Sequence, residues 1–223
     1  MPAGVRFCDV LTIAYIARKR RQATVRGEMA AVAANQPDVL VKATPLLALR
    51  AFMDDNLSPP ALQRVLAKAC AEFPDERNRL GQRVTVASER IPVVLVNRLI
   101  ELTAEELREP ATAVAHRVGR RAAERASTGI MRLAMVLISI PNLLRKLAPV
   151  WSQLYTHGTM SSRSEGNTAT LELTDFPVTS QTGCARITGW FEWFAQKAEQ
   201  TATVNHDPCR AENGPVCRWN VRW

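Results

Sequence analysis

The pattern of apolar and polar positions divides the chain into a long helical part and a shorter mixed part. Apolar residues recur at helical spacing from residue 44 to about residue 155. Ser58 is a suitable N-cap, because Pro59 follows it at the first helical position. Pro149 is expected to kink or restart the last helix. The pattern predicts helices over residues 44–52, from 59 onward, and over 92–102, 111–126, 130–140 and 144–155.

The period changes after His157-Gly158 from helical to alternating. Residues 159–163 and 167–174 are predicted to pair as strands across a Ser-Glu-Gly turn. A helix is expected over 183–200, followed by strands over 201–205 and 216–221. The predicted order is therefore strand, strand, helix, strand, strand.

The helix expected over 183–200 has one apolar face that is expected to contact a core. That face is made by Cys184, Ile187, Phe191, Phe194, Ala195 and Ala198. Trp190 lies at its shoulder and Trp193 lies nearly opposite its centre. Trp193 indicates a second packing layer, made by a neighbouring element or by another subunit. A partly exposed tryptophan without a role is the alternative.

The net charge of +8 is concentrated before residue 150. Residues 1–26 carry six basic residues and one acid, which a solvated N-terminus explains more simply than contact with nucleic acid or an anionic surface. A predicted helical stripe of arginines indicates a solvated face, with phosphate binding as the alternative: Arg117, Arg120, Arg121 and Arg125.

No apolar run reaches the roughly 18 residues of a membrane helix, and no secretory signal is recognisable, so a cytoplasmic protein is expected.

Cysteine and histidine residues near the C-terminus are spaced as metal ligands. Cys8 and Cys70 are isolated in predicted helices and are interpreted as small buried residues. The pattern Cys-x21-His-x2-Cys-x7-Cys can converge at one end of a helix and hairpin: Cys184, His206, Cys209 and Cys217. Three thiolates and an imidazole form a closed tetrahedral set typical of structural Zn²⁺, without an open position for catalysis. A Cys209–Cys217 disulfide, or buried cysteines with His206 as a cap, are the alternatives.

Several motifs in the C-terminal half carry a family resemblance. They resemble a paralogous family of myxobacterial proteins of unknown function and, more distantly, the 4-vinyl-reductase small-molecule-binding domain. That domain shares a superfamily with the TRAPP vesicle-tethering subunits and the haem nitric-oxide-binding domains. The motifs are Leu154-Tyr-Thr-His-Gly158, Leu173-Thr-Asp-Phe-Pro-Val178, Cys184 with Ile187-Thr-Gly-Trp-Phe191, and His206-x2-Cys209-x7-Cys217-x-Trp219-x3-Trp223.

The resemblance covers about residues 44–223 and leaves 1–43 as a basic extension without a counterpart. It implies an α/β (α+β) domain in which helices pack on a four-stranded antiparallel sheet of ββαββ order. It also implies Zn²⁺ bound by Cys184, Cys209 and Cys217, with His206 in place of the carboxylate that phenol-sensing relatives use. A small apolar ligand would lie beside the zinc-bearing hairpin, with the candidate pocket residues Trp151, Tyr155, Phe176, Trp190 and Phe194.

The residues favour a binding module over an enzyme. No nucleophile–base pair, phosphate loop, paired carboxylates on one helix face or redox-cofactor motif is present. Haem is a poor fit, because His116 neighbours an arginine-rich face and the Tyr-x-Ser-x-Arg motif of the haem domains is absent.

The leading hypothesis is a zinc-stabilised, ligand-sensing domain. One alternative is an interaction subunit that dimerises as TRAPP relatives do, motivated by Trp193 and the helix over 130–140; another is nucleic-acid binding through the basic N-terminal half.

Overall fold

The computed structural model describes residues 39–81, 86–127, 138–177 and 179–223. They belong to one compact unit that spans Asp38–Trp223. The basic extension up to residue 38, Cys8 and most of the helix predicted over 130–140 lie outside the described residues. Within the described ranges, no helix combines the length and apolar character that a membrane crossing requires.

The N-terminal part of this unit is helical, as predicted. Its helix α6 has the predicted bounds, Ala111–Ala126. Helix α8 begins earlier than predicted and continues through Pro149, so the expectation that it restarts there is wrong. Ser58 precedes α3 in an extended conformation, but its side chain makes no capping hydrogen bond. The other elements are α2 (Thr44–Asn56), α3 (Pro59–Glu72), the 3-10 helix η1 (Pro74–Glu76), α4 (Arg77–Gly81), α5 (Val93–Leu107) and α8 (Ile140–Leu154).

Two strands of three residues each escape the sequence pattern. Strand β1 (Leu40–Lys42) pairs antiparallel with β2 (Arg90–Pro92), with Val41 opposite Ile91. Val41 also forms a bridge with Tyr155, directly after α8. Strands this short show no alternation that could be recognised in the sequence. They nevertheless attach the end of α8 to the helical part.

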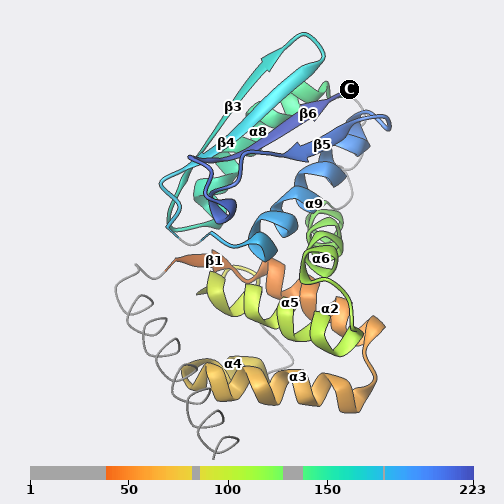
Figure 1. Cartoon of the computed structure of the whole chain (residues 1–223), viewed down its shortest axis with the longest axis vertical. Helices are drawn as coiled ribbons and strands as arrows, with labels where there is room; N and C mark the ends of the chain where they lie inside the picture. Colours follow the sequence, from red (N-terminus) through yellow and green to blue (C-terminus); the bar gives the residue numbers. More distant parts are fainter. Residues whose placement is uncertain (1–38, 82–85, 128–137, 178) are drawn as a thin grey trace, which may run out of the picture. The chain divides into compact units, whose positions relative to one another are not determined.

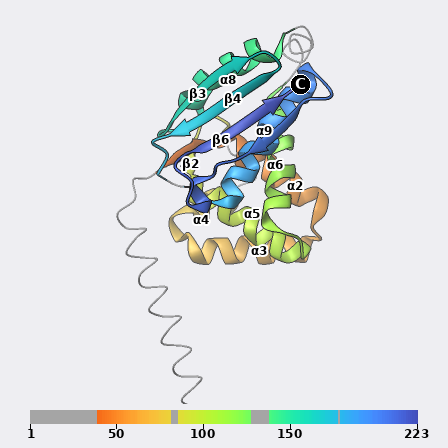
Figure 2. The ribbon, with the colours of Figure 1, turned by 45° about the horizontal axis from the view of Figure 1, so that its top comes forward.

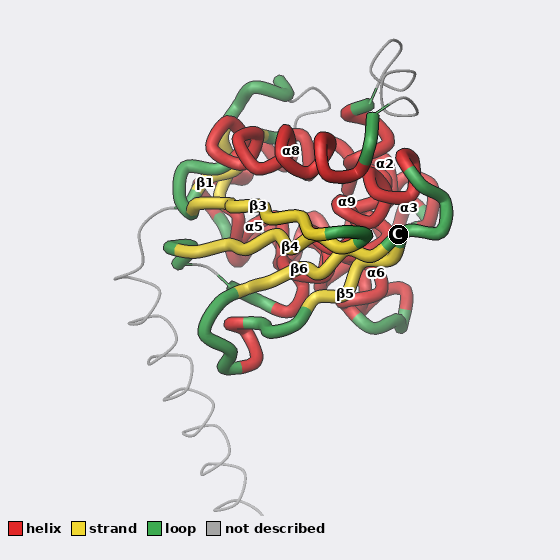
Figure 3. The backbone as a smooth tube through the Cα atoms, turned by 90° about the horizontal axis from the view of Figure 1, so that it is seen from above, coloured by secondary structure: helices red, strands yellow, loops and turns green. Residues whose placement is uncertain are grey.

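The C-terminal part contains the predicted four-stranded antiparallel sheet. The strands are β3 (Thr159–Glu165), β4 (Thr168–Thr174), β5 (Thr203–His206) and β6 (Cys217–Arg222). Their spatial order is β3-β4-β6-β5, with α8 next to β3 (Figure 3). Alternate residues of β4 and β6 are buried, and Leu171 lies opposite Trp219 while Leu173 lies opposite Cys217. The predicted fold class, helices with an antiparallel ββαββ sheet, is confirmed.

Helix α9 (Gln181–Ala198) connects the two hairpins and packs between α6 and the sheet (Figure 1). In Figure 2, α8 and α9 lie behind the strands β3, β4 and β6. The helix begins with a side-chain cap, in which the Ser180 hydroxyl accepts a hydrogen bond of 3.0 Å from the Gly183 amide. Because elements cover α9 on two sides, it has more than one buried face.

Trp193 is buried inside this chain, on the side of α9 that faces α6. Its indole is 6% exposed and lies beside Phe52 and the arginines of α6, with the Lys197 ammonium 5.5 Å from its ring. The second packing layer is therefore a neighbouring element. Trp193 no longer motivates a dimer, and the homodimer stays a prediction that none of the described residues supports.

Candidate ligand cavity and metal centre

The four predicted metal ligands lie together in the structure. Their ligand atoms are all within 4.8 Å of one another. Cys184 comes from the first turn of α9, His206 ends β5, and Cys217 begins β6. The Cys184 sulfur lies 3.7 Å from the sulfurs of both Cys217 and Cys209. Sulfurs bound to tetrahedral Zn²⁺ at 2.3 Å are separated by about 3.8 Å, so the cluster has the dimensions of such a site.

The loop between β5 and β6 folds back on Cys209, so that Cys209 lies near the start of β6. The Cys209 carbonyl accepts hydrogen bonds from the amides of Glu212, at 3.0 Å, and Gly214, at 2.8 Å. Asn213 between them is left-handed, with φ 66°. A Cβ at Gly214 would lie 2.7 Å from the Cys209 carbonyl oxygen, so this close return requires glycine. All four cysteines of the described part are free, so the structure does not contain the alternative Cys209–Cys217 disulfide.

His206 is oriented by an aromatic stack. Its imidazole lies on the ring of Trp219 with centroids 4.6 Å apart, and the Trp219 indole N–H donates to the Thr188 hydroxyl at 2.8 Å. The Nε2 atom of His206 is buried and has no hydrogen-bond partner among the described residues. A buried nitrogen without a partner costs about 1–3 kcal/mol, which coordination to a metal ion would offset.

The cluster contains one sulfur that favours the thiolate form. The hydrogen bond from the Cys184 thiol, and less strongly the nearby His206 imidazole, lowers the pKa of Cys217 to about 4. The same hydrogen bond, together with burial, raises the pKa of Cys184, and burial raises the pKa of Cys209. Metals bind the thiolate form of cysteine. Cys217 is therefore the cysteine of the cluster that loses its proton most readily.

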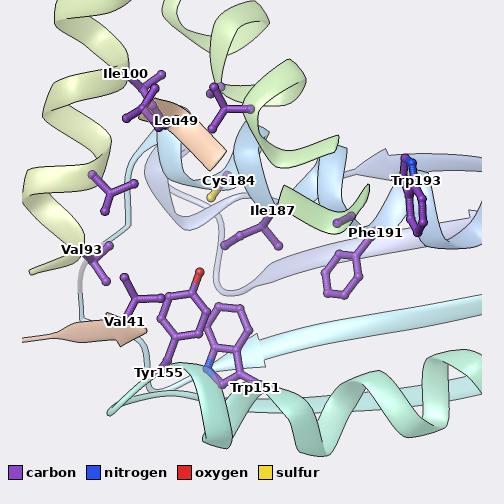
Figure 4. Packing of buried hydrophobic residues seen from close by; sticks show 14 of the residues in the cluster. Val41, Leu49, Val93, Ile100, Trp151, Tyr155, Cys184, Ile187, Phe191 and Trp193 are labelled. Atoms are coloured by element: carbon purple, nitrogen blue, oxygen red, sulfur yellow. The ribbon is translucent and has the colours of Figure 1, made fainter. Parts of the chain in front are cut away.

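A cavity of about 400 Å³ lies between α8, α6 and α9. Of the predicted pocket residues, Trp151, Tyr155, Trp190 and Phe194 line it. Phe176 does not, because it packs edge-on behind Trp151 and Tyr155 at centroid distances of 5.4 and 5.7 Å. Figure 4 shows Trp151 and Tyr155 pointing from α8 and its end toward Ile187 and Phe191 of α9. The two aromatic rings stack with centroids 4.0 Å apart.

Arg186 brings a charge to this apolar cavity. Its side chain lines the cavity, the residue is 5% exposed, and Nη2 donates to the Tyr155 hydroxyl at 3.2 Å. Its Nε atom has no hydrogen-bond partner within the described part of the chain. Arg186 was not among the site residues predicted from the sequence. The available signal was its position one helical turn before Trp190, at the edge of the apolar face of α9.

Three of the four arginines in the stripe of α6 form ion pairs within the chain. Arg117 pairs with Glu109, Arg120 with Glu192, and Arg121 with Asp55. Glu192 also contacts Nε2 of His116 at 2.9 Å. These pairs favour the interpretation of a solvated face over a phosphate-binding one.

The sequence matches no protein-family model and no curated protein. Similar solved structures exist, and several of them are H-NOX proteins. One from S. oneidensis, in the Fe(II)NO ligation state, is 14% identical, with 81% of this chain and 98% of that chain covered and a TM-score of 0.61. The NMR structure of a Shewanella oneidensis H-NOX domain in the Fe(II)CO state is 15% identical, with 81% and 97% covered and a TM-score of 0.61.

An Fe(II) unliganded H-NOX mutant from K. algicida is 10% identical, with 81% and 95% covered and a TM-score of 0.60. Identities this low show a shared fold and carry no function across. The fold of this chain is therefore the one found in these H-NOX structures.

Proposed function

We propose that this chain is a non-enzymatic, small-molecule-binding sensory domain whose C-terminal hairpin is attached to α9 by zinc. The cavity carries this proposal, because about 400 Å³ enclosed by mainly apolar and aromatic walls suits a small organic ligand. The similar H-NOX structure in the Fe(II)NO ligation state shows that another protein with this fold binds a small ligand. Helix α9 carries both Cys184 and a wall of the cavity, so zinc would fix the position of that wall.

Zinc would be held by Cys184, His206, Cys209 and Cys217. The sulfur spacing, the buried Nε2 atom of His206 and the thiolate preference of Cys217 all suit Zn²⁺. With four protein ligands the ion would have no position for water, so its contribution would be to folding.

Haem does not fit this cavity, although similar structures carry Fe(II)NO and Fe(II)CO. All three histidines of the chain are described, and none of them lines the cavity. His116 contacts Glu192, His157 contacts the Thr156 hydroxyl, and His206 belongs to the metal cluster. No cysteine lines the cavity within the described ranges either. Since haem iron is usually held by histidine or cysteine, the proposed ligand is another small molecule.

Metal analysis of protein prepared under reducing, metal-replete conditions is expected to find about one zinc per chain. Cys70→Ser, outside the cluster, should leave this ratio unchanged, and Cys209→Ser should reduce it sharply. A preparation of the native chain without bound zinc would contradict the metal part of the proposal.

Ligand binding is expected to raise the thermal stability of the native chain in a screen of small apolar and amphipathic compounds. Ala122→Phe places a ring at the cavity wall, whereas Ala113→Phe places the same ring on the exposed face of α6. The stabilisation should disappear in the first variant and persist in the second. A native chain that retains no compound in native mass spectrometry and is stabilised by none would refute the binding function.

A further inference from the structure

Among the described residues that line the cavity, one buried side chain is charged, and it has no carboxylate partner. Arg186 makes a single hydrogen bond, to the neutral hydroxyl of Tyr155, and no ion pair with any described residue. Other arginines of the described part are paired even at the surface, such as Arg98 with Glu72 at 2.7 Å and Arg218 with Glu172 at 2.8 Å. Arg186 differs from these arginines because it is buried and still has no such partner.

A buried guanidinium without a counter-charge costs several kcal/mol, so its retention needs a reason. A second, small cavity of about 10 Å³ touches Arg186 and Asn97, whose Oδ1 atom also lacks a partner in the described part. A water molecule there could bridge the two polar atoms. Water is neutral, however, and would leave the positive charge of Arg186 uncompensated.

The charged residues that line the larger cavity in the described part of the chain are both cations. Lys146 lines it from an exposed position, Arg186 lines it from a buried one, and no aspartate or glutamate lines it among the described residues. Tyr155 accepts the hydrogen bond from Arg186, so its own O–H can donate to a ligand. The rest of the wall is mainly apolar, including Ile187, Trp190 and Phe194. The cavity thus combines an anion-binding end with an apolar body.

We propose that the ligand is an amphipathic carboxylic acid, an inference that rests on the proposed small-molecule-binding function. Its carboxylate would pair with the guanidinium of Arg186 and accept the Tyr155 hydroxyl proton in a hydrogen bond. Its apolar body would lie against Ile187, Trp190 and Phe194. Long-chain and aromatic acids share this chemistry, so the experiment includes one of each.

The test compares dodecanoate and 2-naphthoate with their neutral amides, using quenching of the tryptophan fluorescence of Trp151 and Trp190. The native chain should bind one or both acids about 10- to 100-fold more tightly than the matching amide, as a charged hydrogen-bonded pair predicts. The acid that shows this preference indicates whether the apolar part of the ligand is a long chain or an aromatic ring. Arg186→Met should abolish the preference, whereas Arg145→Met, at an exposed arginine of α8 that does not line the cavity, should retain it.

Two further measurements separate binding from a structural role of Arg186. Without ligand, Arg186→Met should be at least as thermally stable as the native chain, because it removes an uncompensated charge at similar volume. If that variant fails to fold, Tyr155→Phe provides the test, since loss of the hydroxyl alone should reduce the acid preference several-fold. Equal binding of acids and amides would overturn the inference and leave the cavity function intact. Absence of binding by all four compounds would overturn the inference, and the compound screen decides whether the proposed function fails with it.

Discussion

Replacing Gly189 by alanine is expected to destabilise the domain by about 3 kcal/mol or more, through overpacking of two helix backbones. A Cβ at residue 189 would overlap the carbonyl oxygen of His116 and lie 2.9 Å from its carbonyl carbon. Those atoms belong to the backbone of α6, so no side-chain rotation can relieve the contact. Alanine normally stabilises a helix by up to about 1 kcal/mol relative to glycine, so the expected sign is the reverse of the intrinsic one.

The same contact is made from the opposite helix. A Cβ at Gly119 of α6 would overlap the carbonyl oxygen of Arg186 and lie 2.8 Å from its carbonyl carbon. Gly119→Ala should therefore have an effect similar to that of Gly189→Ala. Separation of α6 from α9 would also displace the cavity wall, because both helices line it.

Thermal unfolding followed by circular dichroism measures this effect. Gly81→Ala is the matched control, because an added Cβ there meets nothing within 4 Å. The glycine-mediated contact between α6 and α9 would be refuted if Gly189→Ala and Gly81→Ala had equal unfolding temperatures.

The combined change of Cys209→Ser and Cys217→Ser is expected to remove the zinc-dependent part of the stability. Zinc that binds only the folded state adds about 4 kcal/mol when its free concentration is a thousand times the dissociation constant. Both residues are at most 6% exposed, so the two hydroxyls would also replace buried sulfurs that contact Cys184. The hairpin of β5 and β6 should lose its connection to α9 and unfold first.

Chelation separates the metal from the side chains. A strong zinc chelator should lower the unfolding temperature of the native chain and of Cys70→Ser to a similar extent, since Cys70 lies in α3, outside the cluster. The serine double variant should not respond to the chelator. A native chain whose unfolding temperature is unchanged by exhaustive chelation would show that the cluster is held by packing alone.

Local patterns in the sequence determined the long helices and the four strands of the C-terminal sheet. The helical spacing from Ala111 to Ala126 and the alternation in β4 and β6 depend on backbone periods that neighbouring residues fix. The cysteine and histidine spacing was informative for the same reason. Cys184, His206 and Cys217 each lie at the end of an element, and the ββαββ order brings these ends together.

The tertiary structure decided which surfaces these elements present to one another. It placed Phe176 behind two aromatic rings instead of at the cavity, and it buried Trp193 against α6. It also brought Gly119 and Gly189 into backbone contact and enclosed the charge of Arg186. Helical and strand periods say which residues share a face, but what covers that face depends on contacts distant in sequence. For this reason the sequence alone predicted the cluster of cysteines and histidine, and only the packing of α6, α8 and α9 revealed the charged end of the cavity.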